Sequence, residues 1–219
     1  MGEGRRIRLP RGALARLRRS DEGLARVIDQ VGACRMRVGA AETHLASLVR
    51  AIVYQQLSGK AAATIFGRFR ALYPPHRFPT AAQIRRTHYT RLRQVGLSRQ
   101  KQAALRDLCR HVVEGRLPLD DPRDDLGEHE DEALIERLTA VRGIGRWSAQ
   151  IFLMFQLGRL DQWPVDDLAI RKGVARLWGQ EELPGKKAME AWGERCRPYR
   201  TVAAWYLWRS LEIETPGGG

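Results

Sequence analysis

The sequence predicts an all-α fold, and two observations carry this prediction. From Asp21 onward, apolar residues recur with helical spacing almost throughout the chain. No segment shows a convincing alternation of apolar and polar residues, and no repeat of fixed period is found. With 219 residues, 43% of them hydrophobic, the chain can bury a core as one large domain or as two small lobes.

Capping residues and helix breakers predict where the helices of the first half begin and end. Apolar stripes indicate helices around residues 24–31 and 45–52. Ser58 is an N-cap candidate for a helix that stops before Pro74–Pro75. Ser98 opens another helix, which ends at Gly115.

The second half begins with an acidic, proline-containing stretch over residues 117–136, which we interpret as a surface connection leading into a helix. That helix ends near Ala140, and a Gly-Ile-Gly turn separates it from a helix that continues through Leu157. Further helices are expected to start at Asp166–Asp167 and near Lys186. The last helix is expected to run from Pro198 to about Leu211.

The charge balance favours a polyanionic partner. Lys and Arg number 38 against 25 Asp and Glu, which gives a net charge of +13. Only five of the basic residues are lysines, so a genome-wide preference for arginine is the competing explanation. Residues 1–19 are predicted to form a mobile basic arm, because no acidic residue follows Glu3 there. Its arginines are Arg5, Arg6, Arg8, Arg11, Arg16, Arg18 and Arg19.

Cysteine usage and hydropathy exclude several classes of protein. Cys34, Cys109 and Cys196 are widely spaced and form no C-x-x-C pair, which argues against a disulfide framework, a zinc site or an iron–sulfur cluster. No apolar run approaches eighteen residues, and no apolar segment follows the basic N-terminus. We therefore expect a cytoplasmic protein with no membrane partner.

The segment "VRGIGRWSAQ", residues 141–150, suggests a phosphate-binding turn. Gly143 and Gly145 would expose backbone N–H groups while Ile144 points inward. These amides, with the positive end of the following helix, suit one DNA phosphate, and Ser148 could add a hydroxyl donor. A G-x-G pattern by itself is more often a plain turn between helices.

The wider pattern V-x-G-I-G-R-W-[S/T]-A resembles the hairpin of helix-hairpin-helix DNA glycosylases, and a degenerate second copy lies in residues 92–105. In "WPVDDLAIRKG" the resemblance extends to the branch represented by DNA-3-methyladenine glycosylase II, whose catalytic aspartate occupies the second Asp position. It implies that Asp167, 20 positions after Trp147, is catalytic and that Asp166 is more structural. The alternative is that both aspartates only cap the helix.

The resemblance covers roughly residues 20–211 and implies an organisation of domains. It implies two helical lobes with an active-site cleft between them. This is the compact form of the family, without the N-terminal β-rich lobe of longer relatives. One lobe would comprise residues 38–125. The other would comprise the N-terminal helix and residues 126–211, with a tail at 212–219.

The resemblance also implies roles for individual residues around a flipped base. Aromatic side chains of the pocket would be Trp147 and Trp208. Tyr54 is a further candidate for the pocket, with core packing as the alternative. Gln56 or Leu57, in "RAIVYQQLSGKAA", would be the wedge that fills the gap left in the DNA stack.

The same resemblance also implies which groups hold the DNA backbone. The implied phosphate contacts are Gly143, Gly145, Arg146, Ser148 and Ser58. Backbone carbonyls of Thr139, Val141 and Ile144 would hold a monovalent cation, Na⁺ or K⁺, that bridges to DNA phosphate. No other cofactor is implied.

The implied activity is that of a monofunctional DNA glycosylase that excises cationic purines, such as 3-methyladenine and 7-methylguanine, from duplex DNA. Trp147 stands where strand-cleaving relatives carry a lysine nucleophile, so no lyase step is expected. Ile151 stands where some relatives carry an aromatic residue, which leaves the range of bases open. We expect a nucleoid-associated monomer. The alternatives are a non-catalytic DNA-binding protein, a glycosylase for another damaged base, and a helical scaffold whose charge reflects arginine bias.

Overall fold

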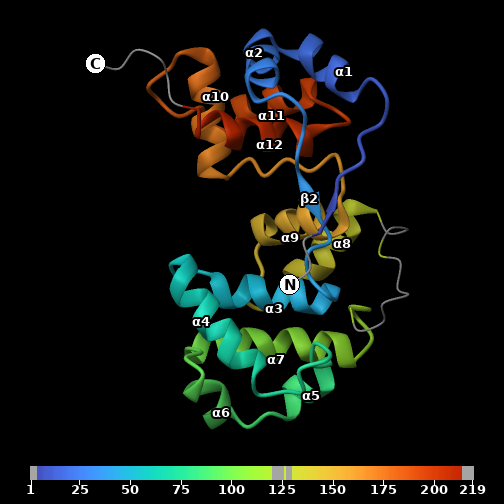
Figure 1. Ribbon diagram of the computed structural model, residues 1–219, viewed down its shortest axis with the longest axis vertical. Coiled ribbons are helices and arrows are strands. Elements are labelled where there is room, and N and C mark those ends of the chain that lie inside the picture. Colours follow the sequence, from blue (N-terminus) through green and yellow to red (C-terminus); the bar gives the residue numbers. More distant parts are fainter. Residues whose placement is uncertain (1–3, 120–125, 127–129, 214–219) are drawn as a thin grey trace. The chain divides into compact units, whose positions relative to one another are not determined.

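The computed structural model describes residues 4–119, 126 and 130–213 (Figure 1). The described residues are helical apart from connecting loops and one short two-stranded sheet, which confirms the all-α prediction. None of the described helices is both long and apolar enough to cross a membrane. Residues 120–125 and 127–129 of the acidic stretch and residues 214–219 of the tail lie outside the described residues.

The described chain folds as two compact units. Residues 39–152 make up the first unit, and residues 5–38 together with 153–213 make up the second. The expected lobes divided the chain differently, since they placed residues 126–152 with the C-terminal part.

Helix α7 is the centre of the first unit, because α3, α5 and α6 all pack against it. Ser58 and Ser98 cap α4 and α7 by accepting backbone N–H groups from Ala61 and Lys101, as expected. The helices of this unit are α3 (His44–Tyr54), α4 (Gly59–Arg70), α5 (Ala81–Arg86), α6 (Tyr89–Gln94), α7 (Arg99–Val113), α8 (Asp131–Thr139) and α9 (Arg146–Phe152).

Helix α12 is the centre of the second unit and packs against α2 and α10. The hydroxyl of Tyr206 on α12 donates to the carbonyl of Gly32 at the end of α2, 2.8 Å away. The elements of this unit are β1 (Arg5–Arg6), α1 (Ala13–Ser20), α2 (Glu22–Val31), β2 (Arg37–Val38), the π-helical turn η2 (Leu153–Leu157), α10 (Leu168–Trp178), α11 (Lys186–Arg195) and α12 (Arg200–Ser210).

Five of the N-terminal arginines lie in a strand or a helix, which differs from the expected mobile arm: Arg5 and Arg6 in β1, and Arg16, Arg18 and Arg19 in α1. Ala13 and Leu17, one helical turn apart, are buried and attach α1 to α2. Arg16 donates from Nε to the carbonyl of Arg197, 2.6 Å away. Apolar burial and this polar contact therefore hold a segment in which arginines occupy the outer face.

All three cysteines are buried, and none of them forms a disulfide. Burial raises the pKa of the Cys196 thiol to about 12, so this side chain is protonated at neutral pH and unreactive.

Trp163 fits into a space that only glycine leaves open. Its indole N–H donates to the carbonyl of Met189, 2.9 Å away, and its ring lies against Trp192. A Cβ on Gly193 would lie 2.5 Å from the indole nitrogen. Close packing of Trp163 on α11 therefore requires glycine at position 193.

Gly193→Ala is expected to lower the free energy of unfolding by about 1–3 kcal/mol, because the added methyl group displaces a buried indole. The measurement is urea denaturation followed by circular dichroism. Gly67→Ala is the matched control, since a Cβ on this helical glycine meets no atom within 4 Å. It should stabilise the protein by roughly 0.5–1 kcal/mol. Equal effects of the two substitutions would contradict the packing argument.

Candidate active site

The turn between α8 and α9 presents backbone amides at the surface. Gly143 adopts a positive φ of 81°, and Gly143 and Gly145 are both exposed. Ile144 is buried, and its N–H donates to the carbonyl of Val141 at 3.1 Å. Within the described part of the chain, the N–H groups of the two glycines have no hydrogen-bond acceptor. The turn has the form of an anion site, and phosphate binding there stays a prediction.

Two side chains from other elements hold this turn in place. Asp107 on α7 accepts the backbone N–H of Arg142 through Oδ2 at 2.8 Å. Gln55 donates from Nε2 to the carbonyl of Gly143 at 2.8 Å. Burial alone would raise the pKa of Asp107, but hydrogen bonds from Arg142 and Arg110 outweigh it and lower the pKa overall. Neither Asp107 nor Gln55 was identified from the sequence, because each lies far from the turn along the chain.

The other predicted residues of the hairpin have different surroundings. Arg146 forms a bidentate ion pair with Glu132 of α8, with Nη2 and Oε2 2.7 Å apart. A phosphate contact by Arg146 would therefore compete with this pair. The Trp147 side chain is 47% exposed, and Ser148 is half-buried.

The predicted wedge lies in the short loop between α3 and α4. Among the described residues, Gln56 is the single non-glycine residue with a positive φ, which is 56°. Leu57 beside it is 39% exposed. Tyr54 is half-buried, with the guanidinium of Arg50 3.9 Å from its ring centroid and Phe66 against its edge. An unusual backbone at an exposed loop is typical of functional positions, and Gln55 joins this loop to the hairpin turn.

Asp167 begins α10 in the second unit, and two N–H donors converge on one of its oxygens. Oδ1 accepts the backbone N–H of Ile170 at 2.9 Å and the indole N–H of Trp208 at 3.1 Å. Asp167 is 9% exposed, whereas its neighbour Asp166 is exposed. Helix capping is thus a real role of Asp167, and it fixes the orientation of the carboxylate.

Trp208 is held on its other side by an aromatic contact. The ring of Phe155, from η2, stacks on it with centroids 5.6 Å apart and an interplanar angle of 27°. Phe155 was not identified from the sequence as a residue of the site. The π-helical turn that carries it was not predicted, although such turns are frequent at functional sites.

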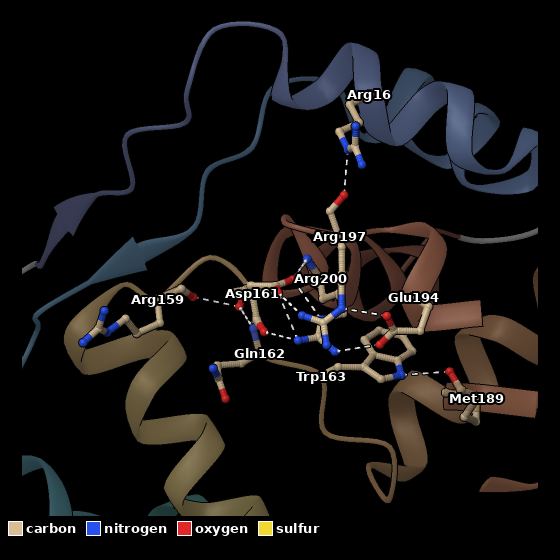
Figure 2. A network of polar contacts seen from close by, with 10 residues as sticks. Arg16, Arg159, Asp161, Gln162, Trp163, Met189, Glu194, Arg197 and Arg200 are labelled. Atoms are coloured by element: carbon tan, nitrogen blue, oxygen red, sulfur yellow. Dashed lines mark hydrogen bonds and ion pairs between the residues drawn. The ribbon is translucent and has the colours of Figure 1, made fainter. Parts of the chain in front are cut away.

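The connector between η2 and α10 is anchored to the first turn of α12 (Figure 2). Arg200 donates to Asp161 from Nε to Oδ1 at 2.8 Å and from Nη2 to Oδ2 at 3.0 Å. Arg200 Nη2 also donates to the Asp161 carbonyl at 2.8 Å, and Arg197 adds a bond to Oδ2 at 2.7 Å. The hydroxyl of Thr201 donates to the carbonyl of Arg159 and accepts the N–H of Gln162.

Helix α12 therefore binds both ends of the segment that leads to Asp167. Its first turn holds Asp161, and Trp208 in its last turn holds the carboxylate itself. The predicted residues thus form two groups. The wedge loop, the hairpin and Trp147 belong to the first unit, and Asp167 and Trp208 belong to the second. The expected cleft between lobes stays a prediction.

A family model described as "HhH-GPD superfamily base excision DNA repair protein" matches residues 49–198. The chain belongs to this superfamily. It is 37% identical to DNA-3-methyladenine glycosylase 1 of Schizosaccharomyces pombe over 88% of this chain and 84% of that protein.

Solved structures of superfamily members agree with this assignment. The structure of a 3-methyladenine DNA glycosylase of S. pombe in complex with abasic DNA matches with a TM-score of 0.81 and 35% identity, covering 92% of this chain and 97% of that one. The structure of a DNA-3-methyladenine glycosidase of Bacillus halodurans matches with a TM-score of 0.81 and 37% identity, covering 90% and 88%.

Arg200→Gln is expected to lower the free energy of unfolding by about 1.5–3 kcal/mol, because it removes charge-assisted hydrogen bonds from a half-buried carboxylate. Urea denaturation measures the change. Arg18→Gln is the control, because Arg18 pairs with Asp29 at the surface, where the side chains are 40% and 65% exposed. That substitution should cost less than about 1 kcal/mol. If the two variants lose the same stability, the anchoring of the connector does not depend on Arg200.

Proposed function

We propose that this chain is a monofunctional DNA glycosylase that removes alkylated, cationic purines such as 3-methyladenine and 7-methylguanine from duplex DNA. The observation that carries the proposal is the Asp167 carboxylate, whose Oδ1 receives two N–H donors at the start of α10. Membership of the superfamily and the names of the relatives support it. It would act as a nucleoid-associated monomer in the cytoplasm.

The chemistry follows from the charge of the damaged base. A purine alkylated at N3 or N7 carries a positive charge, so it leaves with the electron pair of the N-glycosidic bond and becomes neutral. The sugar becomes oxocarbenium-like, and ionised Asp167 would stabilise this cation. Water then adds to C1′ and loses a proton. The donors on Oδ1 keep the carboxylate in one orientation, so no reorganisation is needed during the reaction.

The other candidate residues would bind and position the DNA. The exposed ring of Trp147 and the Trp208 ring would offer electron-rich faces to the cationic base, and Tyr54 would line the pocket. Gln56, held in a left-handed conformation, or the exposed Leu57 would fill the gap in the stack.

The amides of the hairpin turn, with Ser148, Arg146 and the Ser58 helix start, would hold phosphates. Arg146 would do so after exchanging its partner Glu132 for phosphate.

The hairpin turn would also hold a monovalent cation. The carbonyl of Val141 accepts one hydrogen bond, from Ile144, and a carbonyl oxygen has a second lone pair for a cation. Thr139 and Ile144 would contribute the other carbonyls. The ion would supply positive charge for a DNA phosphate, and no further cofactor is proposed.

The decisive experiment compares Asp167→Asn with Asp166→Asn on methylated duplex DNA. Asparagine also caps helices, so Asp167→Asn should fold and bind DNA while losing about 100-fold or more in the rate of base release. Asp166→Asn removes the same charge from an exposed neighbour and should keep the native rate. The readouts are release of 3-methyladenine and the absence of strand cleavage.

Two outcomes would reject the proposal. DNA binding without base release by the native protein would indicate a non-catalytic DNA-binding protein. Equal loss in the two variants would show that the site responds to net charge and not to the Asp167 carboxylate.

Trp147 variants test how the base is recognised. Trp147→Leu keeps an apolar side chain but removes the π face, so release of 7-methylguanine should fall about tenfold, within the 0.5–2 kcal/mol of a cation–π contact. Trp147→Phe retains a π face and should lose less than about threefold. Single-turnover base release measures both. Similar losses in the two variants would assign Trp147 to apolar packing.

A further inference from the structure

The N-terminal strands form a short ribbon that lies outside residues 49–198, the part matched by the family model. β1 and β2 pair antiparallel, with Arg5 opposite Val38 and Arg6 opposite Arg37. The N–H of Ile7 donates to the carbonyl of Met36 at 2.9 Å, which extends the pairing by one residue. We call residues 5–8 and 34–38 the basic ribbon.

The basic ribbon has one apolar face and one arginine face. The apolar face is formed by the buried side chains of Ile7, Cys34, Met36 and Val38. The residues that alternate with them are exposed arginines: Arg6, Arg8, Arg35 and Arg37. Because successive side chains of a strand point to opposite faces, these four arginines share the outer face.

The orientation of the arginine face is fixed by the packing beneath it. β2 packs against η2. The side chain of Val38 also lies close to Gly158, where an added Cβ would be 3.4 Å from Val38 Cγ2. Arg6 donates from Nε to the carbonyl of Cys34 at 3.2 Å, which joins the two strands. The four arginines therefore stand on a structured surface and not on a mobile arm.

The charges on this face favour an anion. Arg6 and Arg37 stand directly opposite each other, an arrangement in which like charges repel. Among the described residues, neither Arg8 nor Arg35 takes part in an ion pair. Both are available to an anion placed over the face, because the guanidinium group matches the geometry of phosphate oxygens.

We propose that the basic ribbon binds the phosphate backbone of duplex DNA, as a contact additional to the hairpin and the wedge loop. Two residues along a strand advance by about 6.8 Å, and paired strands lie about 4.8 Å apart. The arginines of the outer face therefore repeat at regular spacing both along each strand and across the pair. A polyanion with regularly spaced charges suits such a face better than a single phosphate does. The proposal rests on the proposed function only in taking duplex DNA as the ligand.

The experiment measures binding to an undamaged duplex as a function of salt concentration. Arg8→Gln/Arg35→Gln should make the slope of log K against log[salt] less steep by about 1.8, because each lost phosphate contact contributes about 0.9. Affinity at low salt should fall about tenfold. Arg8→Lys/Arg35→Lys should retain most of the slope, because lysine also neutralises phosphate.

Arg19→Gln/Arg26→Gln is the matched control. Both arginines are exposed, belong to the same unit and stand outside the basic ribbon, so this double variant loses the same net charge. Its slope should change by less than about 0.5. If the control and the ribbon variant change the slope equally, or if the ribbon variant keeps the native slope, the proposal is overturned.

The readouts also separate this proposal from the proposed function. Binding to undamaged DNA requires no excision, so a protein that releases no base can still support or overturn the role of the basic ribbon. If the glutamine variant unfolds, which circular dichroism would reveal, the comparison is made with Arg8→Gln and Arg35→Gln as single variants. Each should then change the slope by about 0.9.

Discussion

The convergence of two N–H donors on Oδ1 of Asp167 is the constraint on which the candidate site depends. A nearly buried carboxylate must have its lone pairs satisfied, and here a backbone amide and an indole satisfy them from two different helices. Helix α12 supplies the indole at its last turn and anchors Asp161 at its first turn. The position of the carboxylate is therefore set by tertiary contacts as well as by the capping of α10.

Capping and the proposed catalytic role are compatible demands on the Asp167 side chain. The start of a helix favours a negative charge, and the cation that develops on the sugar requires one. A carboxylate that caps through one oxygen is already oriented before any substrate arrives. The contact between Phe155 and Trp208 extends this order to the aromatic ring, so the Trp208 ring and the carboxylate are held by one set of contacts.

The hairpin of the first unit follows the same principle. Its glycines expose amides, but the turn keeps its shape because Asp107 accepts the Arg142 N–H and Gln55 donates to the Gly143 carbonyl. Gln55 directly precedes Gln56, whose left-handed backbone marks the wedge loop. The proposed phosphate site and the proposed wedge are thus joined by one hydrogen bond.

The sequence by itself determined the helical class, the caps at Ser58 and Ser98, the glycine turn and the aspartate at the start of α10, because these signals are local. It did not reveal the basic ribbon, since two-residue strands offer too few alternating positions. It also did not reveal that α1 is a packed helix, because this depends on the burial of Ala13 and Leu17 against α2. Only the tertiary structure decided which side chains meet: Trp208 with Asp167, Arg200 with Asp161, and Asp107 with the hairpin. Such pairs join residues 35 to 41 positions apart, and no local pattern encodes a contact that exists only after the helices pack.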